Sequence, residues 1–156
     1  MGNSPLRVAQ PADADAITRL INSAFQVESF FKRGDRLDLA EVHARFAKGR
    51  FILAGQDGVI VGCVYVEPGA DRAYIGLLSV EPSLQGSGLG KRLMTAAEEY
   101  CRVAGCGFVD LRVVNLRTEL PPFYRKLGYE QTGTEPFPAE AHTEMPCHFL
   151  IMSKSL

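Results

Sequence analysis

Residues 77–104 constrain the fold more than any other stretch of this chain. They predict the end of an apolar strand (Ala73 to Val80), a turn at Glu81-Pro82, a glycine-rich loop (Gln85 to Gly90) and a long amphipathic helix. Apolar side chains recur there at spacings of three and four, which is typical of one buried helix face. We expect the opposite face to be solvated, with Glu98 and Arg102 paired four residues apart. The predicted buried face consists of Leu89, Leu93, Ala96, Ala97, Tyr100, Cys101 and Ala104.

The glycine-rich loop is predicted to bind an anion, most simply a phosphate. A helix that begins in such a loop presents free backbone N–H groups and the positive end of its dipole, and small side chains let an anion approach closely. Gly86, Gly88 and Gly90 alternate between Gln85 and Lys91, which is more than a turn requires. The alternative is that the glycines only form a tight turn.

Two common phosphate-binding motifs do not fit this loop. A P-loop requires glycine at the position of Gln85 and Ser or Thr at the position of Arg92. A dinucleotide fingerprint that starts at Gly86 requires a small residue where Lys91 stands. A nucleotide-phosphate hydrolase is therefore only a third hypothesis, and it depends on the loop binding ATP.

The pattern Gln-x-x-Gly-x-Gly, made by Gln85, Gly88 and Gly90 between a strand and a helix, resembles the acetyl-coenzyme A (acetyl-CoA) loop of the GCN5-related N-acetyltransferase (GNAT) superfamily. A later segment, Pro122 to Tyr129, resembles the superfamily's second signature, an aromatic-Tyr pair followed by Leu-Gly-aromatic. The order of elements fits nearly the whole chain, so we expect one N-acetyltransferase domain over residues 1–156. The resemblance implies direct transfer of an acetyl group from acetyl-CoA to a primary amine.

The resemblance also assigns roles to particular positions. It implies that the backbone of Leu78 to Val80 binds the pantetheine arm and the acetyl oxygen, much as an oxyanion hole does. Tyr124 is the expected general acid for the leaving thiolate, with a packing role as the alternative. Asn115 stands nine residues before Tyr124 instead of the family's seven, so it either contacts the cofactor or caps the next helix. The expected cofactor-binding residues are Leu78, Ser79, Val80, Gln85, Gly86, Ser87, Gly88, Leu89, Gly90, Lys91, Asn115 and Tyr124.

The acceptor is expected between two loops, residues 26–38 and 134–146. Glu28 and Phe31 in the first loop, and Glu67 at a strand end, are the predicted substrate-binding residues. Three glutamates and no Lys or Arg in the second loop favour a cationic acceptor; these are Glu135, Glu140 and Glu144. A small-molecule amine is the leading hypothesis, and a protein N-terminus or lysine side chain is the alternative.

The general base is not evident from the sequence. Arg112 stands where several superfamily members carry a glutamate, and Asp110, Glu67 and Glu28 are candidates that could equally be solvated carboxylates. A non-catalytic module that binds acyl-CoA as a sensor is therefore the second functional hypothesis.

The remaining pattern predicts a mixed α/β fold. Asp57-Gly58 separates two apolar segments and is a two-residue hairpin signal. The strands around it form an antiparallel meander with the strand that ends at Val80, and the central helix then leads into a parallel strand. Helices are expected on both faces of the sheet. The predicted strands are 6–8, 50–56, 59–67, 73–80, 108–114, 129–133 and 147–153, and the predicted helices begin at Pro11, Leu39, Leu89 and Pro121.

Composition excludes several classes of protein. Seventeen basic and eighteen acidic residues give a net charge of −1, which argues against a general nucleic-acid binder. The sequence has no apolar run of membrane-spanning length and no signal peptide at its start, so we expect a cytoplasmic monomer or homodimer. Four separated cysteines and three separated histidines predict neither a metal site nor a catalytic thiol.

Overall fold

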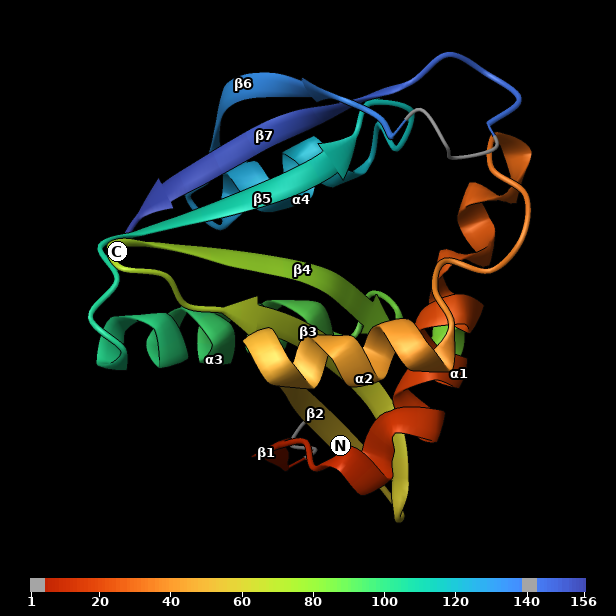
Figure 1. The fold of residues 1–156 in the computed structure, drawn as a ribbon, viewed down its shortest axis with the longest axis vertical. Coiled ribbons are helices and arrows are strands. Elements are labelled where there is room, and N and C mark those ends of the chain that lie inside the picture. The colour runs from red at the N-terminus through yellow and green to blue at the C-terminus, as the bar shows by residue number, and fades with distance from the viewer. Residues whose placement is uncertain (1–4, 139–142) are drawn as a thin grey trace.

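The computed structural model describes residues 5–138 and 143–156 (Figure 1). Its sheet has seven strands in the order β1-β2-β3-β4-β5-β7-β6. The strands are β1 (Leu6–Val8), β2 (Arg50–Gln56), β3 (Val59–Glu67), β4 (Arg72–Val80), β5 (Phe108–Val114), β6 (Glu130–Pro136) and β7 (His148–Ser155). The α-helices are α1 (Ala14–Ala24), α2 (Leu39–Lys48), α3 (Leu89–Val103) and α4 (Leu120–Lys126), and short 3-10 helices are η1 (Pro11–Asp13), η2 (Phe25–Phe30) and η3 (Pro82–Leu84).

The predicted topology is confirmed. β2, β3 and β4 form an antiparallel meander, and α3 connects β4 to the parallel strand β5. Asp57 and Gly58 both have positive φ, 53° and 78°, which is the backbone that a two-residue hairpin turn requires. The chain therefore has the mixed α/β fold expected from its sequence.

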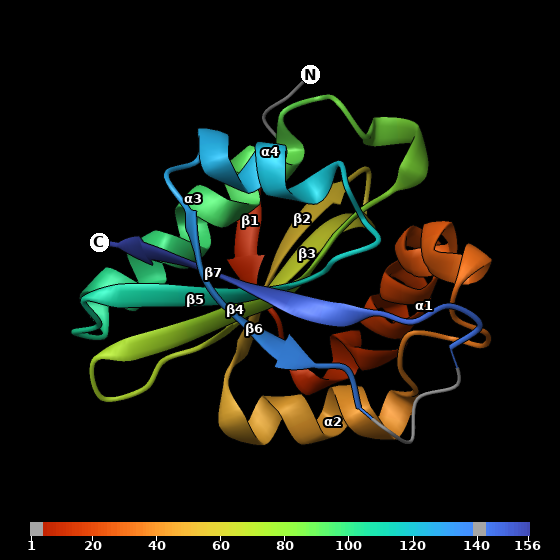
Figure 2. The ribbon, with the colours of Figure 1, turned by 90° about the horizontal axis from the view of Figure 1, so that it is seen from above.

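Helices cover both faces of the sheet and bury two separate cores (Figure 2). On one face α3 packs its apolar side against β3 and β4, with Leu93 and Ala97 fully buried. On the other face α1 packs against the same two strands, with Ile17 and Ile21 fully buried. The meander is thus held between two layers, which fixes the ends of β4 relative to α1 and α3.

The expected solvation of Glu98 is wrong. This side chain on α3 is only 6% exposed. Its carboxylate accepts hydrogen bonds from the Tyr129 hydroxyl at 2.7 Å and the Lys154 ammonium at 2.9 Å. Arg102 instead pairs with Glu99, three residues before it. The partners of Glu98 come from residues 31 and 56 positions away, so the helical pattern could not reveal them.

None of the described helices is long and apolar enough to cross a membrane.

Candidate active site

β4 and β5 separate toward their carboxyl ends. Their parallel ladder consists of three pairs and ends where Tyr74 lies opposite Asp110. Beyond that point the two strands diverge, as the ribbon shows (Figure 1). The separation that the cofactor arm requires, and that no sequence feature predicted, is therefore present.

A β-bulge in β4 lies at this separation. Tyr65 of β3 pairs with Gly76 and Cys63 pairs with Ser79, so two residues of β4 oppose one residue of β3. One of the two, Leu77, has a φ of +55°, which is uncommon for a residue with a side chain. The Ser79 hydroxyl donates to the Leu77 carbonyl at 3.0 Å and helps to hold this conformation. Such outliers concentrate at functional sites, because the surrounding structure must hold them in place.

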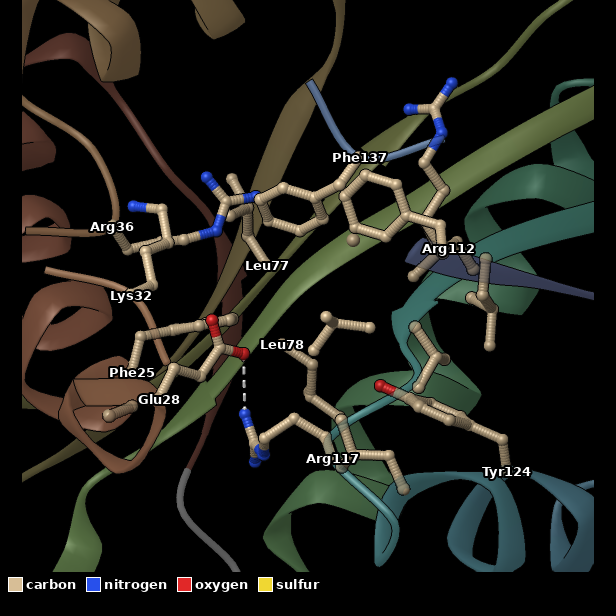
Figure 3. A pocket seen from close by; sticks show the side chains of 18 of the residues that line it. Phe25, Glu28, Lys32, Arg36, Leu77, Leu78, Arg112, Arg117, Tyr124 and Phe137 are labelled. Atoms are coloured by element: carbon tan, nitrogen blue, oxygen red, sulfur yellow. Dashed lines mark hydrogen bonds and ion pairs between the residues drawn. The ribbon is translucent and has the colours of Figure 1, made fainter. Parts of the chain in front are cut away.

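The separated strands enclose a cavity of about 560 Å³ (Figure 3). Leu78 and Val80 of β4 and Leu111 and Val113 of β5 give it apolar walls. Tyr124 from α4 borders it on one side, and side chains from η2 and the following loop border it on the other. One cavity therefore contacts the expected catalytic tyrosine and the expected acceptor loop.

The glycine-rich loop lies where β4 leads into α3. Gly86 and Gly88 have φ values of +83° and +88°, and a Cβ on either would have no atom within 4 Å. Gly88 is the N-cap of α3 and has no side chain to satisfy the first N–H groups of the helix. The Gln85 amide approaches the Val80 carbonyl at 3.4 Å, and Gln85 also lines the cavity.

These features suit a diphosphate at the start of α3. The first turn carries no acidic residue, its N–H groups have no capping side chain, and space is open on the glycine side. Lys91 is exposed on this turn, as is Ser87 before it. Leu89 differs from the rest of the predicted set, because its side chain is buried in the core and only its backbone faces the loop.

Tyr124 is buried, and its hydroxyl points into the cavity (Figure 3). Its ring packs edge-on against Phe123 and Tyr129, with centroids 5.1 Å and 5.9 Å away. Burial raises the pKa of the Tyr124 phenol above its ordinary value, and the charge of Arg117 acts in the opposite direction. The hydroxyl therefore stays protonated at neutral pH and can donate.

Glu28 is not a solvated carboxylate. It lies on η2, is 8% exposed and lines the cavity. Arg117, from the connection between β5 and α4, donates to the Glu28 carboxylate at 2.9 Å and to Glu119 at 2.8 Å. This buried pair joins two segments 89 residues apart, and neither the pair nor the position of Arg117 in the cavity could be predicted from the sequence.

Ser79 and residues 86–91 of the predicted set lie outside the lining of this cavity, and so do Phe31, Asn115 and Glu67. Phe31 is fully buried and packs edge-on against Phe30. Asn115 accepts a hydrogen bond from the His148 backbone at 2.8 Å through its side-chain oxygen, so it ties the end of β5 to β7. Glu67 accepts a hydrogen bond of 2.6 Å from the Tyr65 hydroxyl.

Glu67 borders a second cavity of about 640 Å³, between α2 and the strands. Both cavities share several lining side chains, so they are neighbours across a common wall. Asp110 and Arg112 both border the second cavity, and both are more exposed than their buried neighbours along β5, which places them on the same face of the strand. The Asp110 carboxylate is held by Arg72 at 2.7 Å, and this guanidinium lowers the carboxyl pKa. The shared residues are Arg45, Tyr74, Leu111, Arg112 and Glu135.

The two loops expected to flank the acceptor contact each other. Lys32 forms an antiparallel bridge with Thr143, and the Glu144 N–H donates to the Phe31 carbonyl at 2.7 Å. Arg33 also pairs with the Glu144 carboxylate. The connection from β6 to β7 therefore reaches η2 on the open side of the separated strands (Figure 1).

Two of the three glutamates expected in the second loop are in ion pairs, and one of them, Glu135, lies on β6 instead of in the loop. Glu144 is paired with Arg33, and Glu135 accepts from Arg112 at 2.6 Å. Glu140 lies outside the described residues. The arginines that pair with Glu135 and Glu144 are distant in sequence, so the sequence could not show that these carboxylates have partners.

Two of the four cysteines have thiols that stay protonated at neutral pH. Cys63 is completely buried, and burial raises the pKa of its thiol to about 12. Burial raises the pKa of the Cys101 thiol to about 12 as well. No cluster of metal-binding side chains occurs within residues 5–138 and 143–156.

Comparison with known proteins identifies the family. A model described as "Acetyltransferase (GNAT) family" matches residues 14–129. Streptothricin acetyltransferase from Streptomyces lavendulae is 28% identical over 94% of this chain and 92% of its own length. Aminoglycoside N(6')-acetyltransferase type 1 from Stenotrophomonas maltophilia is 30% identical over 81% of this chain and 86% of its own.

A solved structure shares this fold. A putative acetyltransferase from Salmonella typhimurium, determined with its cofactor acetyl-CoA, superposes with a TM-score of 0.76 at 21% identity, over 99% of this chain and 94% of its own. The chain belongs to the acetyltransferase (GNAT) family and is an acetyl-CoA-dependent N-acetyltransferase.

Proposed function

We propose that the acceptor of the acetyl group is the primary amine of a small molecule. The observation that carries this proposal is the enclosed cavity between β4 and β5, which lies between the glycine-rich loop and the η2 segment. The bridge from Lys32 to Thr143 joins the two acceptor loops on its open side, which leaves less room for a polypeptide than for a small amine. Two relatives that match most of the chain are named streptothricin acetyltransferase and aminoglycoside N(6')-acetyltransferase, which agrees with an acceptor of small size.

In this proposal the chain holds acetyl-CoA at two places. The N–H groups at the start of α3 bind the diphosphate, with Gly86 and Gly88 allowing its close approach. The main-chain groups of β4 after Tyr74, which β5 does not pair, hydrogen-bond the pantetheine arm and the acetyl oxygen. Bound acetyl-CoA supplies a thioester carbon that accepts the amine and a sulfur that leaves as thiolate.

The side chains around the cavity then complete the transfer. Tyr124 donates its phenolic proton to the leaving sulfur, since burial keeps the hydroxyl protonated at neutral pH. Glu28 binds the acceptor amine, and Arg117 holds the Glu28 carboxylate in position. The carbon–sulfur bond breaks as the carbon–nitrogen bond forms, the amine releases its extra proton to water, and the Tyr124 phenolate regains a proton from water.

Two measurements test this proposal. Calorimetric titration with acetyl-CoA, with ATP and NAD as controls, should give saturable binding of the coenzyme alone. Release of free thiol on adding small amines to the loaded protein should then follow saturation kinetics. Binding without any thiol release, across small amines and N-terminal peptides alike, would favour the sensor hypothesis, and release with peptides alone would refute the small acceptor.

A further inference from the structure

We infer that the acceptor carries an anionic group beside its amine, and that Lys32 and Arg36 bind this group. The inference rests on the proposed function, because it concerns the substrate class of the same cavity. It reverses the charge preference that the acidic residues of the second loop suggested.

The described side chains that line the cavity carry a net positive charge. Among the described residues that line it, five side chains are cationic and two are anionic. Both anionic ones, Glu28 and Glu135, are already in ion pairs with Arg117 and Arg112. The cavity therefore has an excess of positive charge that its own carboxylates do not balance. The five cationic side chains are Lys32, Arg36, Arg45, Arg112 and Arg117.

The surroundings of Lys32 and Arg36 suit a bound anion. Within the described part of the chain neither has a carboxylate within ion-pair distance. The Lys32 ammonium reaches only the Asp35 carbonyl, at a long 3.4 Å. The Arg36 guanidinium lies over the Phe25 ring, 5.5 Å from its centroid. Both side chains are half-buried, and charges that lose water without gaining a counter-ion are costly.

Lys32 and Arg36 lie across the cavity from Tyr124. Figure 3 shows Lys32, Arg36 and Phe25 together on the side of the cavity that η2 forms, with Tyr124 entering from the opposite side. Glu28 lies between these groups and Arg117. A ligand that joins an amine to a carboxylate or a phosphate would match this order, with its amine at Glu28 and its anion at Lys32 and Arg36.

The same positive charges should disfavour polycationic ligands. A ligand with several ammonium groups would bring like charge beside Lys32 and Arg36, which disfavours it. The cavity should therefore accept amino acids or phosphorylated amines and disfavour polyamines.

The test uses matched amines and acetyl-CoA with the full chain. L-phenylalanine is compared with L-phenylalaninamide, and O-phosphoethanolamine with ethanolamine, by the rate of thiol release. The anionic member of at least one pair should have a kcat/KM at least tenfold higher than its neutral partner. The first pair reports a carboxylate and the second a phosphate, so the panel also separates the two anion classes. The amide has the less basic amine and more of its reactive neutral form, so amine basicity cannot produce a preference for the acid.

Variants locate the preference. Lys32→Gln and Arg36→Gln should each lower kcat/KM for the anionic amine tenfold to hundredfold more than for its neutral partner, through KM, because each removes one charge-assisted hydrogen bond. Arg102→Gln is the control, because it removes the same charge from the exposed outer side of α3. Equal rates for both members of each pair, or equal losses for both in the variants, would overturn the inference and leave the proposed function intact.

Binding of the acetylated products tests the anion site even if no acetyl transfer is observed. If no amine in the panel releases thiol, the proposed small acceptor fails, and the anion site is judged by calorimetry on the protein saturated with CoA. N-acetyl-L-phenylalanine or N-acetyl-O-phosphoethanolamine should then bind, and N-acetyl-L-phenylalaninamide should bind at least tenfold more weakly. Lys32→Gln should remove this difference. Equal binding of the acids and the amide, or binding of none, would refute the anion site.

Discussion

Removing the hydroxyl of Tyr124 should slow acetyl transfer without destabilising the protein, whereas the same change at Tyr129 should do the reverse. Both tyrosines are buried, and their rings are in contact. The Tyr124 hydroxyl faces the cavity, while the Tyr129 hydroxyl donates to the Glu98 carboxylate at 2.7 Å. Tyr124→Phe and Tyr129→Phe therefore delete the same atom from two environments. One hydroxyl faces the cavity, and the other is hydrogen-bonded to a buried carboxylate.

The structure sets the expected magnitudes. Tyr129→Phe leaves a buried carboxylate with one hydrogen bond fewer, which costs about 1–3 kcal/mol of unfolding free energy. For a chain of this length that lowers the Tm by roughly 2–12 °C. Tyr124→Phe removes no hydrogen bond recorded among the described residues, so its cost should stay below about 0.5 kcal/mol. Loss of a general acid should lower kcat about 10²–10³-fold, and a hundredfold loss is about 2.7 kcal/mol.

Thermal unfolding and steady-state thiol release on both variants give the assay. For the wild type, ionisation of the Tyr124 phenol should not reduce kcat between pH 7 and pH 10, because burial raises its pKa above the ordinary value. A kcat of Tyr124→Phe within threefold of the wild type would refute the acid role. An unchanged Tm of Tyr129→Phe would refute the account of the Glu98 contact.

Three further predictions concern the loop, the pH dependence and the buried ion pair. Gly88→Ala and Gly58→Ala should each lose about 1 kcal/mol of stability because both glycines have positive φ and open surroundings, but only Gly88→Ala should weaken acetyl-CoA binding, by about tenfold; equal affinities by calorimetry would contradict the phosphate role. The Arg7 guanidinium lowers the pKa of the Asp13 carboxyl to about 2. Asp13→Asn should therefore cost about 1 kcal/mol of unfolding free energy above pH 4, and urea titrations should show this difference shrinking as the pH falls toward about 2. Arg117→Gln should cost about 1–3 kcal/mol in chemical denaturation and raise the acceptor KM, because it leaves a buried carboxylate without its charged partner; an unchanged KM would argue against a role in amine binding.

The fold was predictable because local signals and the global topology agree. Asp57-Gly58 specified the hairpin, and Asp38, the residue before the helix predicted to begin at Leu39, caps α2 by accepting from the Glu41 N–H at 2.8 Å. Gly128 follows the last turn of α4 with a φ of +100°, the conformation that favours glycine just after a helix end. Such signals depend on a few neighbouring residues and therefore survive in a single sequence.

The site was predictable only where it is made of backbone or of the two signatures. The glycine-rich loop leads into α3 and Tyr124 borders the cavity, and the roles that the resemblance implies for them stay predictions. The charge pairs Glu28–Arg117 and Glu135–Arg112 join distant segments, so their neutralising effect was invisible. Cytoplasmic location, oligomeric state and the lack of nucleic-acid binding stay predictions.

In the proposed binding mode, the short ladder between β4 and β5 makes the cosubstrate a structural component of the sheet. Among the described residues, the strand pairing between the meander and the half of the sheet formed by β5, β7 and β6 consists only of the pairs from Arg72 to Tyr74. Past Tyr74, β4 has an internal edge, whose peptide groups remain open to exchange with solvent until a ligand arm lies along them. Turnover should therefore alternate the sheet between a loosely joined and a bridged state, and amide hydrogen exchange in β4 should slow when acetyl-CoA binds.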